Sequence, residues 1–321
     1  MAFTKFFKAK PQPDPRVRWF GKLPSYGDYY SSPADADWVV EFNDWILKGF
    51  ELYHGRLRAA NLPSKRMPIS ACIVRLPQSG MTVFASLLDY GGDMRGRPFP
   101  MCFYVAVPTA QWPGPTCGHV PAAARTVRDL MSLRRHVAHF LNSPGRFESV
   151  FADRSVPVTD LTSDAQDDSW RIEGRALEFS DWFRDAAAGM KIEIPGVWLL
   201  QSRHWGERVK SCEGKDFAPT LRFPLATRFS LEVQVAGWFR WIEKRMDLAR
   251  RAVSLFVVGD LERETGHLVV IARAPLKDDF LLLTPLAASL PYVDDLSALT
   301  AAPDATSAAA LPKTWVDFVD A

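Results

Sequence analysis

The sequence is poor in cysteine and has no excess of charge of either sign. Its four cysteines are spread over 321 residues without a CxxC pair, which argues against a zinc ribbon and against a small secreted disulfide scaffold. Lysine and arginine total 39 and aspartate and glutamate total 37, so the net charge is +2. Because this balance gives little long-range attraction for phosphate backbones or anionic lipid, we expect no nucleic-acid partner.

Long hydrophobic runs are also missing. The longest stretch without a formal charge, residues 98–124, contains six prolines, which would break a membrane-spanning helix. The first ten residues include three lysines, but no apolar segment of about 7–15 residues follows them, so we expect no cleaved signal peptide. The sequence therefore predicts a cytoplasmic protein that does not span a membrane.

The common catalytic and cofactor motifs are absent. No GxxxxGK[ST], strand-to-helix GxGxxG, GxSxG or HExxH pattern occurs, so no catalytic residue and no cofactor is predicted. His136 and His139 lie three residues apart on a predicted helix, but no third ligand is near in the sequence. Cys117 and His119 lie in a loop rich in proline and glycine, where a spacing of two does not bring a nucleophile to its base. We therefore predict a non-enzymatic protein without a metal.

Hydrophobic periodicity predicts a mixed α/β (α+β) fold with mostly antiparallel sheets flanked by helices in layers. In the first half, helices are predicted over residues 34–60 and 125–141 and strands over 16–24, 69–76, 81–88 and 98–108. In the second half, helices are predicted over 177–188 and 230–250 and strands over 197–202, 220–226, 252–259, 267–274 and 280–285.

The length and a change of composition near residue 151 predict two domains, each with its own sheet. The predicted parts are a flexible N-terminal tail (1–15), a first domain (16–150), an acidic linker with a connecting helix (151–190), a second α/β domain (191–300) and a C-terminal linker with a docking segment (301–321).

Two glycine-rich loops carry the most distinctive polar residues. The first, GKLPSYGD (21–28), contains Asp28, and the second, GGDMRGRPFP (91–100), contains Arg97. A guanidinium can bind a carboxylate with two hydrogen bonds where two loops meet, so we expect Arg97 to pair with Asp28. Two interpretations stay open: the loops form a structural clip, or Lys22, Asp28 and Arg97 form the site of a hydrolase or another enzyme that binds a small anion.

With these motifs the sequence resembles the TagF (ImpM) family associated with bacterial type VI secretion. The resemblance covers residues 16–145 and rests on WFGKLPSYGDYY, FNDWIL and GGDMRGRPFPM. The loop positions that match the family pattern are Gly21, Lys22, Pro24, Gly27, Asp28, Asp93, Gly96, Arg97, Phe99 and Pro100. The resemblance implies a cytosolic, non-catalytic regulator that represses the secretion system after translation, in part by contacting its forkhead-associated scaffold protein.

Candidate partner-binding residues lie outside these motifs. Trp112 lies in a loop rich in proline and glycine, where no apolar stripe requires it to be buried. Near the C-terminus, Leu311, Trp315, Phe318 and Val319 recur at helical spacing. This segment is predicted to dock either into the groove of a partner or onto the protein's own core.

Overall fold

The computed structural model describes residues 15–63, 66–112, 114, 116–138, 143–151, 154–155, 168–187, 194–211, 220–226, 228–246, 248, 252–259, 266–286, 290, 293–295 and 311–321. Its centre is one nine-stranded sheet with the order β2-β1-β5-β4-β3-β7-β8-β6-β9. The strands are β1 (Arg18–Lys22), β2 (Tyr29–Ser31), β3 (Ser70–Leu76), β4 (Met81–Leu88), β5 (Met101–Pro108), β6 (Thr220–Leu225), β7 (Ser254–Val258), β8 (Gly266–Ile271) and β9 (Val293–Asp295). All neighbouring strands pair antiparallel except β6 and β9, which are parallel.

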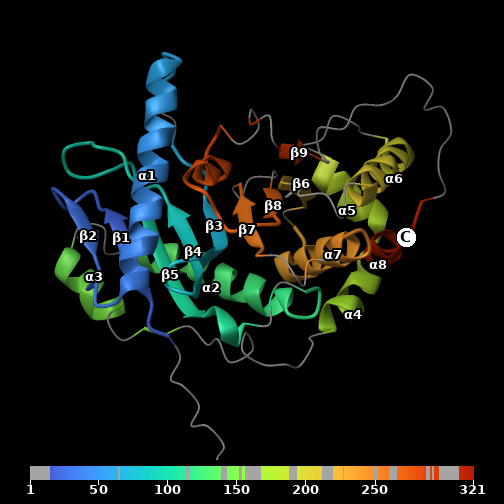
Figure 1. Ribbon diagram of the computed structural model, residues 1–321, viewed down its shortest axis with the longest axis horizontal. Coiled ribbons are helices and arrows are strands. Elements are labelled where there is room, and N and C mark those ends of the chain that lie inside the picture. The colour runs from blue at the N-terminus through green and yellow to red at the C-terminus, as the bar shows by residue number, and fades with distance from the viewer. Residues whose placement is uncertain are drawn as a thin grey trace, which may run out of the picture.

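Helices cover both faces of this sheet (Figure 1). They are α1 (Asp37–Ala59), α2 (Val120–Ala138), α3 (Pro144–Phe151), α4 (Ser169–Ala176), α5 (Phe179–Ala186), α6 (Pro195–Ser211), α7 (Leu231–Glu243) and α8 (Trp315–Asp320), with 3-10 helices η1 (Thr109–Gln111) and η4 (Lys277–Leu283). The mixed α/β class and the mostly antiparallel sheet that the sequence predicted are confirmed.

The alternation of side chains along each strand divides the core into two layers. On β3, Cys72 and Val74 point to a core that contains α1 and η4, whereas Ala71 and Ile73 point to a core that contains α2, α7 and α8. Such alternation is the geometry of a strand buried on both faces. Each layer contains residues from both halves of the chain.

The two halves share this sheet through the pairing of β3 with β7, in which Ser70 lies opposite Val258. A second junction lies on the α1 face. The Nε1 of Trp45 donates to the carbonyl of Leu276 at 3.0 Å, and Gly49 lies so close to Phe280 that a Cβ on this glycine would be 2.3 Å from it. The strands predicted for two separate sheets therefore belong to one.

Two strand predictions in the second half are wrong. Residues 197–202 belong to α6, and residues 280–283 belong to η4. Among the α6 side chains that the structure describes, the buried ones include Trp198, Leu199, Ser202 and Trp205, which recur at helical spacing. A short apolar run does not distinguish a buried strand from a buried helix, and here the periodicity continues past the run.

Short elements were missed. No strand was predicted for β2 or β9, and no helix for α3 or α4, because segments of three to eight residues carry little periodic signal.

None of the helices that the structure describes combines the length and the apolar composition that a bilayer crossing requires.

Candidate functional site

The two glycine-rich loops meet beside β1, and a buried carboxylate joins them. The side chain of Asp93 has 0% exposure, and its Oδ2 lies 3.3 Å from Lys22 Nζ on β1. The same oxygen accepts a hydrogen bond from Arg97 Nε at 2.7 Å. The other oxygen, Oδ1, accepts the backbone N–H groups of Arg95 and Arg97 at 2.9 and 3.0 Å. Both oxygens of Asp93 are thus fully used within the protein.

Two further contacts tie the loops together. Arg97 Nη2 donates to the carbonyl of Gly27 at 2.6 Å, and the N–H of Met94 donates to the carbonyl of Tyr26 at 3.1 Å. Arg97 therefore contacts a carboxylate of its own loop and a carbonyl of the other. We call the Lys22, Asp93 and Arg97 side chains together the ionic clip.

The pair predicted between Asp28 and Arg97 is wrong. Asp28 Oδ1 accepts the N–H of the next residue, Tyr29, at 2.8 Å, while Arg97 binds Asp93. Asp93 precedes Arg97 by four residues in the same tight loop, which brings the two side chains together without the other loop. In the structure, the carboxylate that pairs with Lys22 and Arg97 is therefore that of Asp93.

The clip favours the ionised form of Asp93. Burial alone would raise the pKa of this carboxyl, but the N–H groups of Arg97 and Arg95 and the side chains of Arg97 and Lys22 outweigh it. The pKa of Asp93 is therefore held well below its ordinary value of 3.8.

Two glycines allow close approach of backbone segments beside the clip. Gly21 has φ +154°, and a Cβ there would lie 2.3 Å from the carbonyl oxygen of Pro100 on the neighbouring loop. Gly92 has φ +101°, and a Cβ there would lie 2.5 Å from the carbonyl oxygen of Arg97. Neither position accepts a side chain without a shift of backbone.

The remaining motif residues shape the same loops. Pro24 follows Leu23, whose carbonyl accepts the N–H of Tyr26 at 3.0 Å and closes a turn. The N–H of Gly96 donates to the carbonyl of Asp93 at 2.8 Å. Phe99 is buried, and its ring packs edge-on against Phe20 and Tyr29 with centroids 5.5 and 4.9 Å apart.

Three large apolar side chains stand exposed beside the clip. Tyr26, Tyr29 and Met94 are 41%, 39% and 66% exposed. The Tyr29 ring lies under Lys22 Nζ, 4.9 Å from it, and a Cβ on Gly27 would lie 3.3 Å from the Met94 sulfur. We call these three residues the loop surface. The sequence did not single them out, because neither the loops nor the three-residue strand β2 has a periodic pattern that reveals which side chains are exposed.

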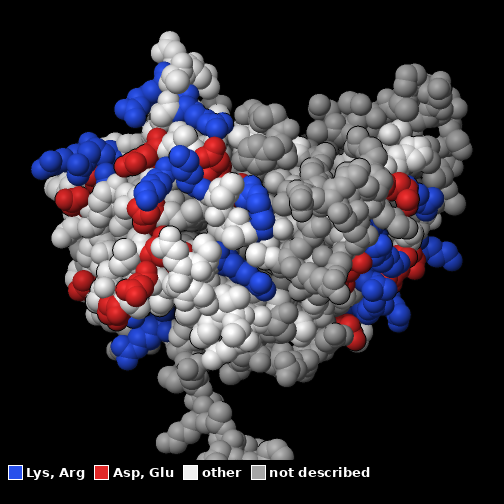
Figure 2. Space-filling model, in the orientation of Figure 1, with Lys and Arg blue, Asp and Glu red and all other residues white. Residues whose placement is uncertain are grey.

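Charge does not mark a single binding face. On the side of the molecule shown in Figure 2, acidic and basic side chains of the described residues interleave around α1 and the adjoining loops. This pattern agrees with the small net charge of the sequence.

The exposure predicted for Trp112 is wrong. Its side chain is 2% exposed and packs edge-on against Phe84 at 5.6 Å, with the Arg75 guanidinium 5.7 Å from the ring. A loop rich in proline and glycine can still place one aromatic side chain in the core, where it buries a large apolar area.

The C-terminal segment packs onto the protein's own core. Trp315, Phe318 and Val319 are 0%, 2% and 0% exposed, whereas Leu311 is 47% exposed. Of the two docking modes left open by the sequence, the structure shows the intramolecular one.

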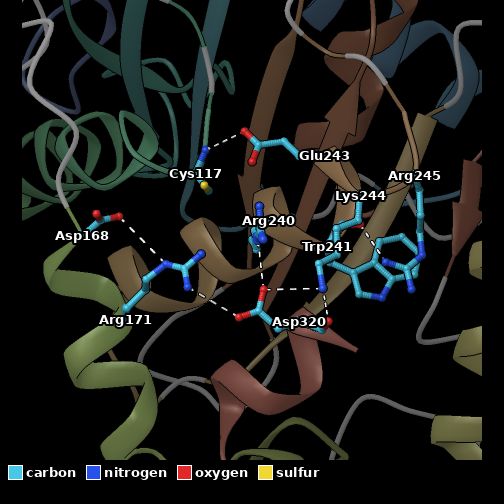
Figure 3. Close-up of polar contacts among 9 residues, drawn as sticks. All are labelled: Cys117, Asp168, Arg171, Arg240, Trp241, Glu243, Lys244, Arg245 and Asp320. Carbon is cyan, nitrogen blue, oxygen red and sulfur yellow. Dashed lines mark hydrogen bonds and ion pairs between the residues drawn. The ribbon is translucent and has the colours of Figure 1, made fainter.

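Sequence reasoning missed a second ionic cluster, which surrounds Asp320 (Figure 3). Asp320 Oδ1 accepts from Arg240 Nε at 2.9 Å and lies 3.5 Å from Lys244 Nζ, and its Oδ2 lies 3.6 Å from Arg171 Nη1. Burial opposes ionisation of Asp320, but the Arg240 hydrogen bond and the charges of Lys244, Arg240 and Arg171 lower the pKa of its carboxyl. Arg171 lies on α4, Arg240 lies on α7 and Lys244 directly follows α7. All three are far from Asp320 in the sequence, and no local spacing relates them to it.

The loop that contains Cys117 and His119 does not form a nucleophile pair. His119 Nδ1 lies 2.7 Å from the Thr116 hydroxyl, and the Cys117 N–H donates to Glu243. Burial, followed by the charge of Glu243, raises the pKa of the Cys117 thiol to about 12, so the thiolate is disfavoured. Within the described parts of the chain, no group of three His, Cys, Asp or Glu side chains is placed to hold a metal. The side chain of His136 and all of His139 lie outside the described residues.

Comparison with known proteins places the two loops within a family domain. Residues 18–140 match the model of the TagF N-terminal domain, which is type VI secretion system-associated. The crystal structure of PA0076 from Pseudomonas aeruginosa PAO1 is similar at 20% sequence identity with a TM-score of 0.35. The match covers 44% of this chain and 63% of that one, so this chain spans less than two thirds of that protein. A search of curated proteins found no match.

The match includes β1, α1 and both glycine-rich loops, and therefore the whole ionic clip. It confirms the resemblance that the loop motifs indicated. Residues 18–140 of the chain are thus similar to the TagF N-terminal domain, which is described as type VI secretion system-associated.

Proposed function

We propose that the protein is a cytoplasmic, non-catalytic regulator of a type VI secretion system that represses it after translation by binding one of its components. The family match to residues 18–140 carries this proposal. The forkhead-associated scaffold protein of the system is the candidate partner, as the family resemblance implies.

The chemistry of the ionic clip supports binding rather than catalysis. Lys22 and Arg97 are already paired with Asp93, whose two carboxylate oxygens make four contacts in all. A group so fully bonded is poorly placed to move protons or to attack a substrate. The clip instead fixes the backbone of two loops.

The loop surface is the part of the domain that we assign to the partner. The clip and its backbone contacts hold Tyr26, Tyr29 and Met94 outward at one end of the sheet. Exposed aromatic and methionine side chains on a rigid support lose little conformational freedom on binding, which favours their use at interfaces.

Affinity purification tests the proposal. The tagged full-length chain is expressed in its own bacterium, and captured proteins are identified by mass spectrometry beside a mock control. Recovery of the scaffold or another secretion component is expected. If no such component exceeds the mock control, the regulatory proposal is wrong.

A matched pair of variants tests the surface. Tyr26→Ser with Met94→Ser removes two side chains of the loop surface, and Val40→Ser removes an apolar side chain that is 56% exposed on α1. We expect the double variant to lose the captured component at an unchanged melting temperature, and Val40→Ser to retain it. Equal capture by the two variants would place the contact elsewhere.

A further inference from the structure

The C-terminal helix α8 occupies a groove lined by aromatic side chains of α5, α6 and α7. The Trp315 ring lies 4.4 Å from the Trp182 ring and 5.1 Å from the Trp238 ring, between centroids. The Phe318 ring lies 5.1 Å from that of Phe179. Two aromatic side chains three residues apart, on one face of a helix, thus fill the groove.

Two glycines leave space for these side chains. A Cβ on Gly237 of α7 would lie 2.2 Å from Trp315 Nε1, and a Cβ on Gly174 of α4 would lie 2.9 Å from Val316 Cγ2. Trp315 Nε1 also donates to the carbonyl of Val233 at 3.3 Å. The groove therefore has a polar partner for the indole as well as room for the ring.

The main chain of the segment is bound too. The N–H of Phe179 donates to the carbonyl of Lys313 at 3.1 Å, and the N–H of Trp315 donates to the carbonyl of Leu177 at 2.9 Å. The helix then begins with a capping box of its own, in which Thr314 and Asp317 bond reciprocally to each other's backbone N–H. The segment needs no other element to start its helix.

The far end of the groove binds a carboxylate. Asp320 lies among Arg171, Arg240 and Lys244, and Lys244 Nζ also donates to the backbone carbonyl of Asp320 (Figure 3). Three cations around one side chain exceed what a single exposed ion pair supplies. They select an acidic group at the end of the helix, two residues after Phe318.

We propose that this groove is a peptide-binding site and that residues 311–321 are its ligand, bound within the same chain. The recognised chemistry is a short helix with Trp and Phe three residues apart and a carboxylate two residues after the Phe. Every recognition element lies within residues 313–320, and residues 296–310 of the sequence separate the segment from β9. The groove therefore also binds residues 311–321 when a separate molecule supplies them. This inference does not depend on the proposed regulatory function.

The test uses the full chain with a protease site placed within residues 301–308, so that folding precedes cleavage. The nicked protein is diluted to nanomolar concentration with a labelled peptide of residues 311–321, and binding is followed by fluorescence anisotropy. We expect the labelled peptide to exchange into the groove with saturable 1:1 binding. The uncut chain is expected to bind much less peptide, because its own segment acts at a high effective concentration.

Peptide variants test the recognition chemistry. Trp315→Ala is expected to weaken binding by about 100-fold, as for a buried interface anchor. Asp320→Asn is expected to weaken it by about 5-fold, since the carboxylate is partly exposed. Leu311→Ala, at an exposed position, is the matched control and should bind like the unaltered peptide.

Three outcomes would overturn the inference. A nicked chain that unfolds, or that never exchanges its segment, makes residues 311–321 an integral part of the core rather than a ligand. Equal binding of the Trp315→Ala peptide makes the association nonspecific. Equal binding of the Asp320→Asn peptide removes the carboxylate from the recognised chemistry.

Discussion

At the scale of single residues, Asp93 is a buried carboxylate within residues 18–140, the part of the chain that matches the family model. Its carboxylate has no exposure and is ionised because two backbone N–H groups and two cations face it. The folded protein therefore stabilises the ionised form of Asp93 through contacts that the unfolded chain lacks.

This charge predicts a pH dependence of stability. The pKa of Asp93 lies below its ordinary value of 3.8 in the folded protein, so the unfolded chain takes up a proton first as the pH falls. The stabilisation from the clip is complete above that ordinary value and is lost as the pH falls from it toward the lower folded pKa. We expect Asp93→Asn to lower the urea midpoint at pH 7 and to flatten its fall below about pH 4.

Asp44→Asn is the control for this measurement. Asp44 pairs with Lys48 on the surface of α1, where the two side chains are 51% and 60% exposed. If Asp93→Asn and Asp44→Asn gave the same pH profile, the buried clip would not be the source of the acid sensitivity.

Gly21 gives a second prediction at this scale. A methyl group there would lie 2.3 Å from the Pro100 oxygen, so we expect Gly21→Ala to cost about 3 kcal/mol in the free energy of unfolding. Urea denaturation measures this cost. Gly55→Ala, in α1 where a Cβ meets nothing within 4 Å, should instead stabilise by about 0.7 kcal/mol. A loss under about 1 kcal/mol at Gly21 would show that the loops move apart easily.

The sequence identified the residues of the clip but not their pairing. Lys22, Asp93 and Arg97 all belong to the two loop motifs, because charged residues close to glycines in a short loop form a recognisable sequence pattern. Which carboxylate binds Arg97 depends on how tightly residues 93–97 turn, and composition does not encode that. The Asp320 cluster was missed for the same reason, since its cations come from helices distant in sequence.

At the scale of elements, the buried Gln234 connects α7 to its neighbours. Its Oε1 accepts from the Ala226 N–H at 2.7 Å and from Trp182 Nε1 at 2.9 Å, and its Nε2 donates to the Ala226 carbonyl at 2.8 Å. One amide thus satisfies groups on α5 and on the connection from β6 to α7.

Replacement of this amide by an apolar side chain leaves those groups unpaired. We expect Gln234→Leu to cost about 3 kcal/mol in the free energy of unfolding, measured in urea. Gln111→Leu, at an exposed position in η1, is the control and should change it by under about 0.5 kcal/mol. Similar values for the two variants would mean that α5 and α7 are held by apolar packing alone.

Elements with a long periodic pattern were predicted well, and short ones were not. Helix α1 was predicted over residues 34–60 and spans Asp37–Ala59, because its apolar side chains recur over six turns. The strand predicted at 197–202 failed because Trp198 and Leu199 alone do not reveal a period. The helical face is completed by the buried Ser202, the last residue of the run, and by the buried Trp205 beyond it.

At the scale of the whole molecule, the single sheet joins the two halves that the composition separates. β3 from the first half pairs with β7 from the second, and α1 packs against η4. Both core layers contain side chains from both halves.

We therefore predict one cooperative unfolding transition. Tryptophan fluorescence and far-ultraviolet circular dichroism should give coincident curves in urea, because neither half retains a closed core when β3 and β7 separate. Two transitions, or non-coincident curves, would show that residues 16–150 and 191–300 unfold as independent domains. Phe280→Ala at the α1 junction should move the one transition to lower urea without splitting it.

The pairing of β3 with β7 also has a consequence during synthesis. β7 begins about 180 residues after β3 ends, so at ribosomal rates of ~5–20 residues per second the edge of β3 waits roughly 10–40 s for its neighbour. During that interval the backbone groups on the β7-facing edge of β3 are open to pairing with strands of other nascent chains. Slower translation lengthens the time for which this edge lacks its neighbour.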